Sequence, residues 1–73
     1  MKGSRITMES MTEIRMWLRT VGAFIYTKNR LMDLDLMEEE IREAYKNGLL
    51  DVRMYQTALL TIKRERRIEQ EKG

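Results

Sequence analysis

Apolar residues recur along the chain at intervals of three and four, a pattern typical of helices that bury one face. In the stretch SMTEIRMWLRTVG the apolar positions on one such face are Ile14, Trp17, Leu18 and Val21. Ser10 followed three residues later by Glu13 fits a capping box at the start of a helix. Gly22 suits a C-terminal cap in the left-handed conformation. The pattern therefore predicts a first helix between Ser10 and Gly22.

A second helix is predicted from about Arg30 to Asn47. Its apolar positions are Leu34, Met37, Ile41, Ala44 and Tyr45. Asn29 is a suitable N-cap. Acidic residues crowd the first turns, where negative charge complements the helix dipole. Gly48 is expected to end this helix, as Gly22 ends the first.

A third helix is predicted to begin after Asp51, which is a good N-cap. Its apolar stripe comprises Tyr55, Ala58, Leu59 and Ile62. Beyond Ile62 the sequence KRERRIEQEKG forms helix readily but offers few apolar side chains. We therefore expect its end to fray.

These elements predict an all-α fold, a small antiparallel three-helix bundle. Residues 10–67 would form the domain, residues 1–9 a flexible N-terminal extension, and residues 68–73 a frayed C-terminal tail. The predicted core comprises Ile14, Trp17, Leu18, Val21, Leu34, Met37, Ile41, Tyr45, Tyr55, Ala58, Leu59 and Ile62. Several remaining Leu and Met residues do not fit inside this core, so a self-association face is plausible.

The composition excludes several chemistries. The chain has no cysteine and no histidine, which removes disulfides, thiolate metal sites and the commonest general base. Asp33 and Asp35 offer carboxylates to magnesium, but two acids in the first turns of a helix are better explained by its dipole. A glycine-rich phosphate loop is absent. The sequence predicts a protein that is not an enzyme, with no metal, cofactor or small-molecule substrate.

Charge is segregated along the chain. Residues 1–30 carry a net charge of +4, residues 31–52 of −5, and residues 53–73 of +3. After folding, this order can give the molecule one positive and one negative side. The longest apolar run, around Val21 to Tyr26, is interrupted by Gly22 and is far too short to cross a membrane. We expect a cytoplasmic protein without membrane contact.

The connector GAFIYTKNR, residues 22–30, is the best candidate for a binding site. It places Tyr26 close to Lys28 and Arg30, and proteins that bind single-stranded nucleic acid combine aromatic platforms with positive charge. If the first and third helices run in the same sense, the basic end of the third helix meets this connector. The candidate residues for binding single-stranded DNA or RNA are Arg15, Arg19, Tyr26, Lys28, Arg30, Lys63, Arg64, Arg66 and Arg67.

Other interpretations remain open. Phe24 and Ile25 are expected to plug the end of the bundle, and Tyr26 taken alone is better explained as a half-buried structural residue. Trp17 is assigned to the core. The alternative function is a protein-interaction module, an adaptor or a homodimer, because segregated charge favours electrostatic docking and seven methionines give adaptable apolar surface.

The stretch from Trp17 to about Glu65 resembles the YqgQ-like family of small bacterial proteins, found mainly in Gram-positive bacteria. The likeness lies in FIYTKNR, in RLMDLDLMEEEIREAYKNGLLD and in MYQTALLTIKRE. The resemblance implies a compact three-helix bundle of unknown function, for which single-stranded nucleic-acid binding has been proposed, and no catalytic residue. Family members often have glycine where this chain has Lys28, which shifts the emphasis to Tyr26, Arg30 and the third helix.

Overall fold

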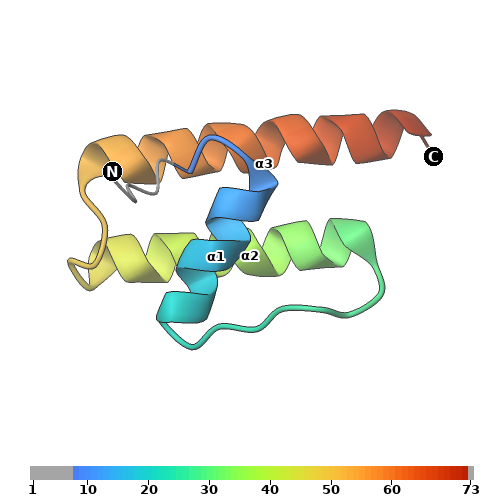
Figure 1. The fold of residues 1–73 in the computed structure, drawn as a ribbon. Coiled ribbons are helices and arrows are strands. Elements are labelled where there is room, and N and C mark those ends of the chain that lie inside the picture. The colour runs from blue at the N-terminus through green and yellow to red at the C-terminus, as the bar shows by residue number, and fades with distance from the viewer. Residues whose placement is uncertain (1–7, 73) are drawn as a thin grey trace, which may run out of the picture.

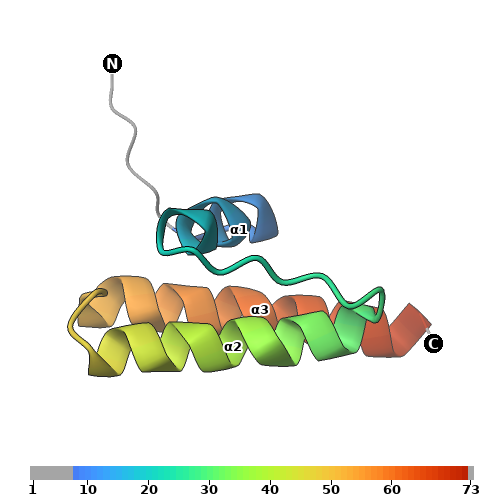
Figure 2. The ribbon, with the colours of Figure 1, turned by 90° about the horizontal axis from the view of Figure 1, so that it is seen from below.

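The computed structural model describes residues 8–72 of the chain. It contains α1 (Met11–Thr20), α2 (Arg30–Lys46) and α3 (Val52–Lys72), and these described residues form no strand. Helices α2 and α3 lie side by side as an antiparallel hairpin, and α1 crosses over them (Figure 1). Seen from below, α1 and the α1–α2 connector form a second layer on the hairpin (Figure 2). The prediction of a small all-α three-helix bundle is confirmed.

The predicted N-caps hold the starts of the helices. The Ser10 hydroxyl accepts a hydrogen bond from the Glu13 amide at 3.2 Å, and the Asn29 side chain accepts one from Met32 at 3.0 Å. Asp51 does the same for the Met54 amide at 2.8 Å. Each side chain thus satisfies an amide that has no partner inside its helix. The Glu13 carboxylate accepts a hydrogen bond from the Glu9 amide at 3.0 Å.

Both internal glycines end their helices in the predicted left-handed conformation. Gly22 has φ 84° and Gly48 has φ 79°. After α1, the Ala23 amide donates to the Leu18 carbonyl at 2.8 Å and the Gly22 amide donates to Arg19 at 3.0 Å. These two bonds make a Schellman motif, which turns the chain sharply out of the helix. The same pair of bonds follows α2, so both connectors leave in fixed directions.

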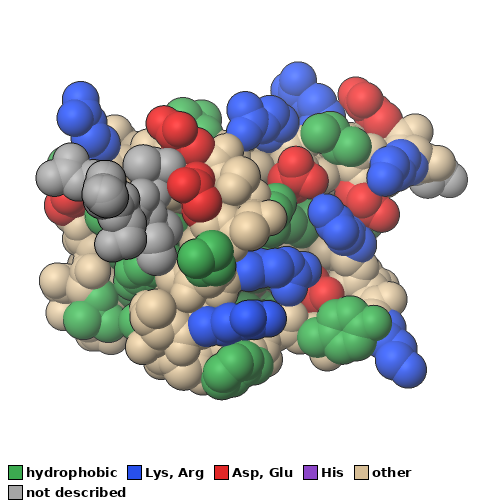
Figure 3. Space-filling model, in the orientation of Figure 1, with side chains coloured by type: hydrophobic (Ala, Val, Ile, Leu, Met, Phe, Trp, Pro, Cys, Tyr) green, Lys and Arg blue, Asp and Glu red, His purple; other side chains and the backbone are tan. Residues whose placement is uncertain are grey.

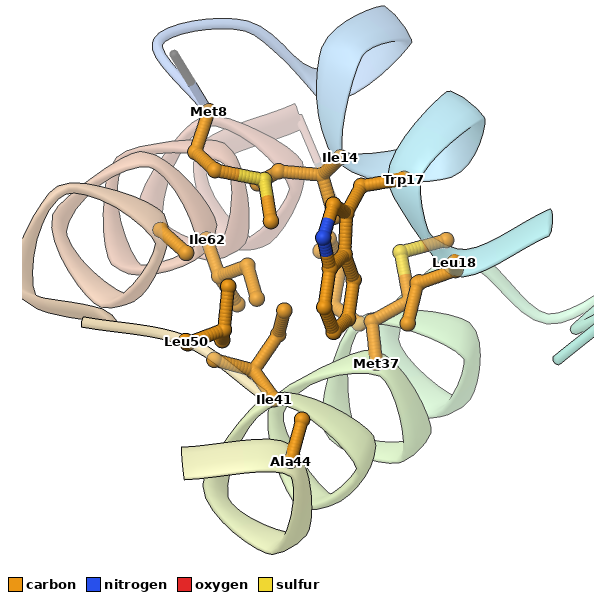
Figure 4. Close-up of a cluster of buried hydrophobic side chains, with 11 residues drawn as sticks. Met8, Ile14, Trp17, Leu18, Met37, Ile41, Ala44, Leu50 and Ile62 are labelled. Atoms are coloured by element: carbon orange, nitrogen blue, oxygen red, sulfur yellow. The ribbon is translucent and has the colours of Figure 1, made fainter. Parts of the chain in front are cut away.

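One cluster of apolar side chains fills the space between the two layers (Figure 4). Its buried members are Met8, Ile14, Trp17, Leu18, Leu34, Met37, Ile41, Ala44, Leu50, Ala58 and Ile62. All three helices therefore contribute to a shared core, and the predicted assignment of Trp17 to it is confirmed. Tyr55 and Leu59, also predicted core residues, are partly buried against the cluster.

The prediction that Val21 and Tyr45 belong to the core is wrong. Val21 is exposed because α1 ends at Thr20, so Val21 is the C-cap and no longer follows the helical face. Tyr45 is also exposed, and its ring stacks on that of Tyr55 with centroids 4.1 Å apart. The predicted core omitted Met8 and Leu50, which lie outside the helices, and also Ala44, although Ala44 was recognised as an apolar position of the second helix.

Met8 joins the segment before α1 to α3. Its side chain is fully buried and points into the core (Figure 4), and the buried Thr61 hydroxyl donates to its carbonyl at 2.8 Å. Arg64 donates to the neighbouring carbonyl of Glu9 at 3.3 Å. Met8 therefore belongs to the packed domain, although the sequence placed it in the extension of residues 1–9. Residues 1–7 of that extension lie outside the described residues. At the other end, α3 continues as helix through the predicted tail to Lys72.

An ion-pair cluster links α2 to the second half of α3. Arg66 contacts the carboxylates of Glu38 at 2.7 Å and Asp35 at 2.8 Å. Glu38 also accepts from Arg42 one turn further along α2, at 2.7 Å. Hydrogen bonds from Arg66 and then Arg42 lower the pKa of Glu38 below its ordinary value. The acidic helix and the basic helix therefore neutralise each other along this side of the hairpin.

Candidate nucleic-acid interface

Side chains of the α1–α2 connector alternate between solvent and core. Phe24 is 77% exposed and Tyr26 is 75% exposed, whereas Ala23 and Ile25 pack against the buried cluster. An extended chain produces this alternation because successive side chains point to opposite sides. The prediction that Ile25 plugs the bundle agrees with its packing, but the same prediction for Phe24 is wrong. The interpretation of Tyr26 as a half-buried residue is also wrong.

Hydrogen bonds fix the connector at its middle and at its far end. Arg15 of α1 donates to the Ile25 carbonyl at 3.4 Å. Asp33 of α2 accepts at one carboxylate oxygen from the Thr27 amide at 2.8 Å and from the Thr27 hydroxyl at 2.7 Å. Asp33 is itself buried. The two exposed rings are therefore carried on a segment whose backbone is held in place, not on a free loop.

The electrostatics of Asp33 follow from these contacts. The hydrogen bond from the Thr27 side chain lowers the pKa of the carboxyl, and Arg15 and Arg30 lower it further by their charge, while burial opposes them. The carboxylate therefore stays ionised at neutral pH and keeps both bonds to Thr27. The acid that the sequence offered as a magnesium ligand instead anchors the connector.

A surface hollow of about 340 Å³ lies between α1, the connector and α2. Helix α1 lines it with Arg15, Leu18 and Arg19, the connector with residues 23–26, and α2 with Met37. We call Arg15, Arg19, Phe24 and Tyr26 the aromatic–arginine patch. On this face of the molecule, Lys and Arg side chains lie among exposed hydrophobic ones across the middle and lower part (Figure 3). Positive charge and aromatic surface thus meet around one depression.

Two further candidate residues follow Tyr26. Lys28 is exposed and forms no hydrogen bond or ion pair with other described residues, so its ammonium is free for a ligand. Arg30 instead contacts Glu65 at 3.4 Å and Glu69 at 3.8 Å, both on α3. Arg30 is therefore partly neutralised where the sequence expected an available positive charge.

The basic cluster of α3 divides in two. Arg66 is engaged by Asp35 and Glu38, and Arg64 donates to the Glu9 carbonyl. Lys63 and Arg67 are exposed and have no ion-pair partner among residues 8–72. No α3 residue lines the hollow. The predicted convergence is therefore only partial: the second half of α3 meets the start of α2, but α1 crosses the hairpin instead of running along α3 (Figure 1).

Phe24 is the functional candidate that the sequence analysis missed. It lies two residues before Tyr26, so both rings fall on the same side of an extended segment. The run AFIYT already carries the signal, because a short connector between two capped helices is more readily extended than helical. The alternation of exposed and packed positions then makes Phe24 a partner of Tyr26.

Lys28 occupies a strained backbone position. Its φ is 68°, in the left-handed region that β-carbons disfavour and glycine tolerates. We expect Lys28→Gly to raise the free energy of unfolding by about 0.5–1 kcal/mol, measured by urea denaturation. Lys28→Ala is the matched control, because it removes the charge but keeps the β-carbon. A gain of equal size in both variants would assign the effect to charge and contradict the backbone explanation.

The described residues hold no group of three or more acidic side chains arranged to bind a metal. Asp33 and Asp35 in particular are engaged separately, by Thr27 and by Arg66. Among residues 8–72, no helix combines the length and the apolar character that crossing a membrane requires.

Comparison with known proteins identifies the family. The model of the YqgQ-like family matches residues 8–68, which span the whole of α1 and α2 and most of α3. No curated protein and no solved structure matches the chain significantly. The matched region begins at Met8, the first residue of the packed core, and includes the connector and the whole aromatic–arginine patch. The chain belongs to the YqgQ-like family.

Proposed function

We propose that this protein binds single-stranded nucleic acid at the aromatic–arginine patch, as a non-enzymatic protein of the cytoplasm. The observation that carries the proposal is the exposure of Phe24 and Tyr26 beside Arg15 and Arg19 around one hollow. Large aromatic side chains that stay mostly exposed in the folded chain are suited to packing against a ligand. Bases of a single strand offer flat faces for such rings, and its phosphates pair with arginine.

The two arginines have donors left for phosphate. Arg15 uses one terminal nitrogen for the Ile25 carbonyl, and a guanidinium carries five N–H donors in all. Arg19 has no hydrogen bond or ion pair from its side chain to another described residue. The two residues are four apart on α1, so they lie on the same side of the helix. They can therefore contact neighbouring phosphates while the bases stack on the connector.

Order in the connector supports binding. The contact of Arg15 with Ile25, the packing of Ile25 on the core and the bonds of Thr27 to Asp33 restrain the backbone before any ligand arrives. A restrained site loses less conformational entropy on binding than a flexible one. This arrangement favours a binding surface over an incidental exposure of two hydrophobic rings.

Fluorescence anisotropy with labelled single-stranded DNA and RNA, and with matched duplexes, tests the proposal. We expect single strands to bind more tightly than duplexes, because paired bases do not present their faces. Tyr26→Ala should weaken binding about fivefold, near the lower end for loss of one base–aromatic stack. The matched control is Tyr45→Ala, which removes another exposed tyrosine ring, one that does not line the hollow.

Circular dichroism of both variants serves as the control that each remains folded. Equal losses of oligonucleotide affinity in Tyr26→Ala and Tyr45→Ala would contradict a binding site at the connector. Absence of binding to every oligonucleotide at low salt would reject the function.

Protein binding, including homodimerisation, is the second candidate. Apolar side chains are exposed around the α2–α3 turn, at Tyr45, Leu49 and Val52, and these lie outside the hollow lining. Such a surface suits an apolar protein contact. High salt weakens phosphate contacts steeply but changes an apolar interface little. Self-association that persists in high salt, together with no oligonucleotide binding, would favour this candidate.

A further inference from the structure

The number of aromatic faces and available cations in the patch bears on how long a strand it can hold. Phe24 and Tyr26 are two residues apart on the extended connector, so their backbone positions are separated by about 6.6 Å. The pair offers stacking surface for two bases. Arg15 and Arg19, with β-carbons about 5–6 Å apart, serve the phosphate that joins the two nucleotides and one that flanks them. Lys28 adds one more cation just beyond Tyr26.

Beyond this set the positive surface is interrupted. Arg30, the next cation along the chain, is paired with Glu65 and Glu69. Arg66 is paired with Asp35 and Glu38. Neither arginine is therefore fully available to a phosphate chain leaving the connector towards α3. Lys63 and Arg67 remain available, but α3 does not line the hollow.

The surface therefore differs from the continuous grooves of many single-strand binders, whose sites cover about 4–16 nucleotides. We propose that the aromatic–arginine patch, with Lys28, binds a short segment of two to three nucleotides. The two bases would stack on Phe24 and Tyr26, and about three phosphates would contact Arg15, Arg19 and Lys28. This inference rests on the proposed function and specifies the ligand: a short oligonucleotide or a short stretch within a longer strand.

A length series tests the inference. Unlabelled oligothymidylates and oligouridylates of one to about twelve nucleotides compete against one labelled strand. Because a longer oligonucleotide can occupy the site in several registers, each measured affinity is divided by the number of registers that its length offers. The corrected affinity should rise at least about tenfold from one to three nucleotides and change less than about threefold beyond that. The logarithm of affinity should fall with the logarithm of salt concentration with a slope of about −2, as expected for three single-strand phosphate contacts.

The double variant Lys63→Glu/Arg67→Glu is the matched control. It reverses the available charges of α3. The corrected affinity for the trinucleotide should stay within about twofold of the unsubstituted protein's, and the salt slope for an oligonucleotide of about twelve nucleotides should not change. Tyr26→Ala should remove most of the gain between one and three nucleotides.

Three other outcomes are decisive. A corrected affinity that keeps rising to about eight nucleotides, with a salt slope near −5, would replace the short site with a long track that includes α3. A loss of binding in the α3 variant would do the same. Absence of binding at every length would reject the proposed function itself, whereas binding with a long footprint would reject only the present inference.

Discussion

Truncation of Met8 to alanine is expected to lower the free energy of unfolding by about 2–5 kcal/mol. The Met8 side chain is fully buried among the core residues of two layers, so its removal leaves a cavity as well as losing apolar contacts. A domain of this size has a total stability of only several kcal/mol, so the variant is expected to be partly unfolded at room temperature. Urea and thermal denaturation monitored by circular dichroism measure the loss.

Met16→Ala is the matched control, because Met16 lies on α1 but is exposed. Its expected loss is within about 0.5 kcal/mol. Comparable effects of the two substitutions would contradict the inclusion of Met8 in the core and would return it to a loosely attached extension. Helical spacing assigned neither Met8 nor Met16 to the core. The comparison therefore also tests whether helical spacing overlooked a core residue at Met8.

Replacement of Arg66 by methionine is expected to lower the free energy of unfolding by about 2 kcal/mol at neutral pH. The substitution keeps an apolar stem against the hairpin but removes the contacts to Glu38 and Asp35. Only 17% of the Glu38 side chain is exposed, so its carboxylate loses a partner in a place that water reaches poorly. The Asp35 side chain is 67% exposed and contributes little.

The loss of unfolding free energy in Arg66→Met should become smaller as the pH falls. The pKa of Glu38 is lowered in the folded state, so the ion pair contributes its full stability above the ordinary glutamate pKa of 4.5. That contribution disappears as the pH falls through the lower, folded-state pKa and Glu38 takes up a proton. Urea denaturation of both proteins from about pH 7 to about pH 2 measures the difference.

Lys63→Met is the control for Arg66→Met. Lys63 is exposed on α3 and has no ion-pair partner among the described residues, so its replacement should cost little at any pH. A cost of Arg66→Met that stayed constant over the whole pH range would assign the effect to packing of the side chain instead of its charge.

Helical spacing and cap chemistry were sufficient to predict the three helices. Ser10, Asn29 and Asp51 act as N-caps, and Gly22 and Gly48 take the left-handed conformation that ends α1 and α2. These signals are local, because each depends on a few neighbouring residues and on hydrogen bonds that the helix itself leaves unmade. These local signals therefore specify where all three helices begin and where α1 and α2 end, whereas α3 continues to Lys72 through the tail that was expected to fray.

Three of the errors in the predicted core, at Met8, Val21 and Leu50, lie outside the helices, whereas Tyr45 lies within α2 and is exposed. Val21 continues the spacing of α1, but the cap ends the helix one residue earlier. Met8 and Leu50 are buried from non-helical segments, where no periodicity identifies the inward side. Spacing within a helix predicts which face is apolar. It does not predict which loop residues close the ends of the core.

The candidate site was predicted in part for a similar reason. Tyr26, Arg15 and Arg19 do lie around one hollow, but Arg30 and Arg66 are paired with acids distant in sequence. The sequence counts charges and does not show which of them neutralise each other across two helices. Such pairing follows from the antiparallel packing of α2 against α3 and from the register between them, which the spacing of apolar residues leaves undetermined (Figure 1).

The two-layer arrangement has a consequence for local opening of the native state. Helices α2 and α3 are long and run side by side, and ion pairs join them, whereas α1 has ten residues and crosses over them. Short elements with few neighbours exchange their amide hydrogens through openings that leave the rest of the fold intact. The layer with Arg15, Arg19, Phe24 and Tyr26 is therefore the one expected to open first. A ligand on those residues would slow amide exchange in α1 while leaving exchange in the hairpin nearly unchanged.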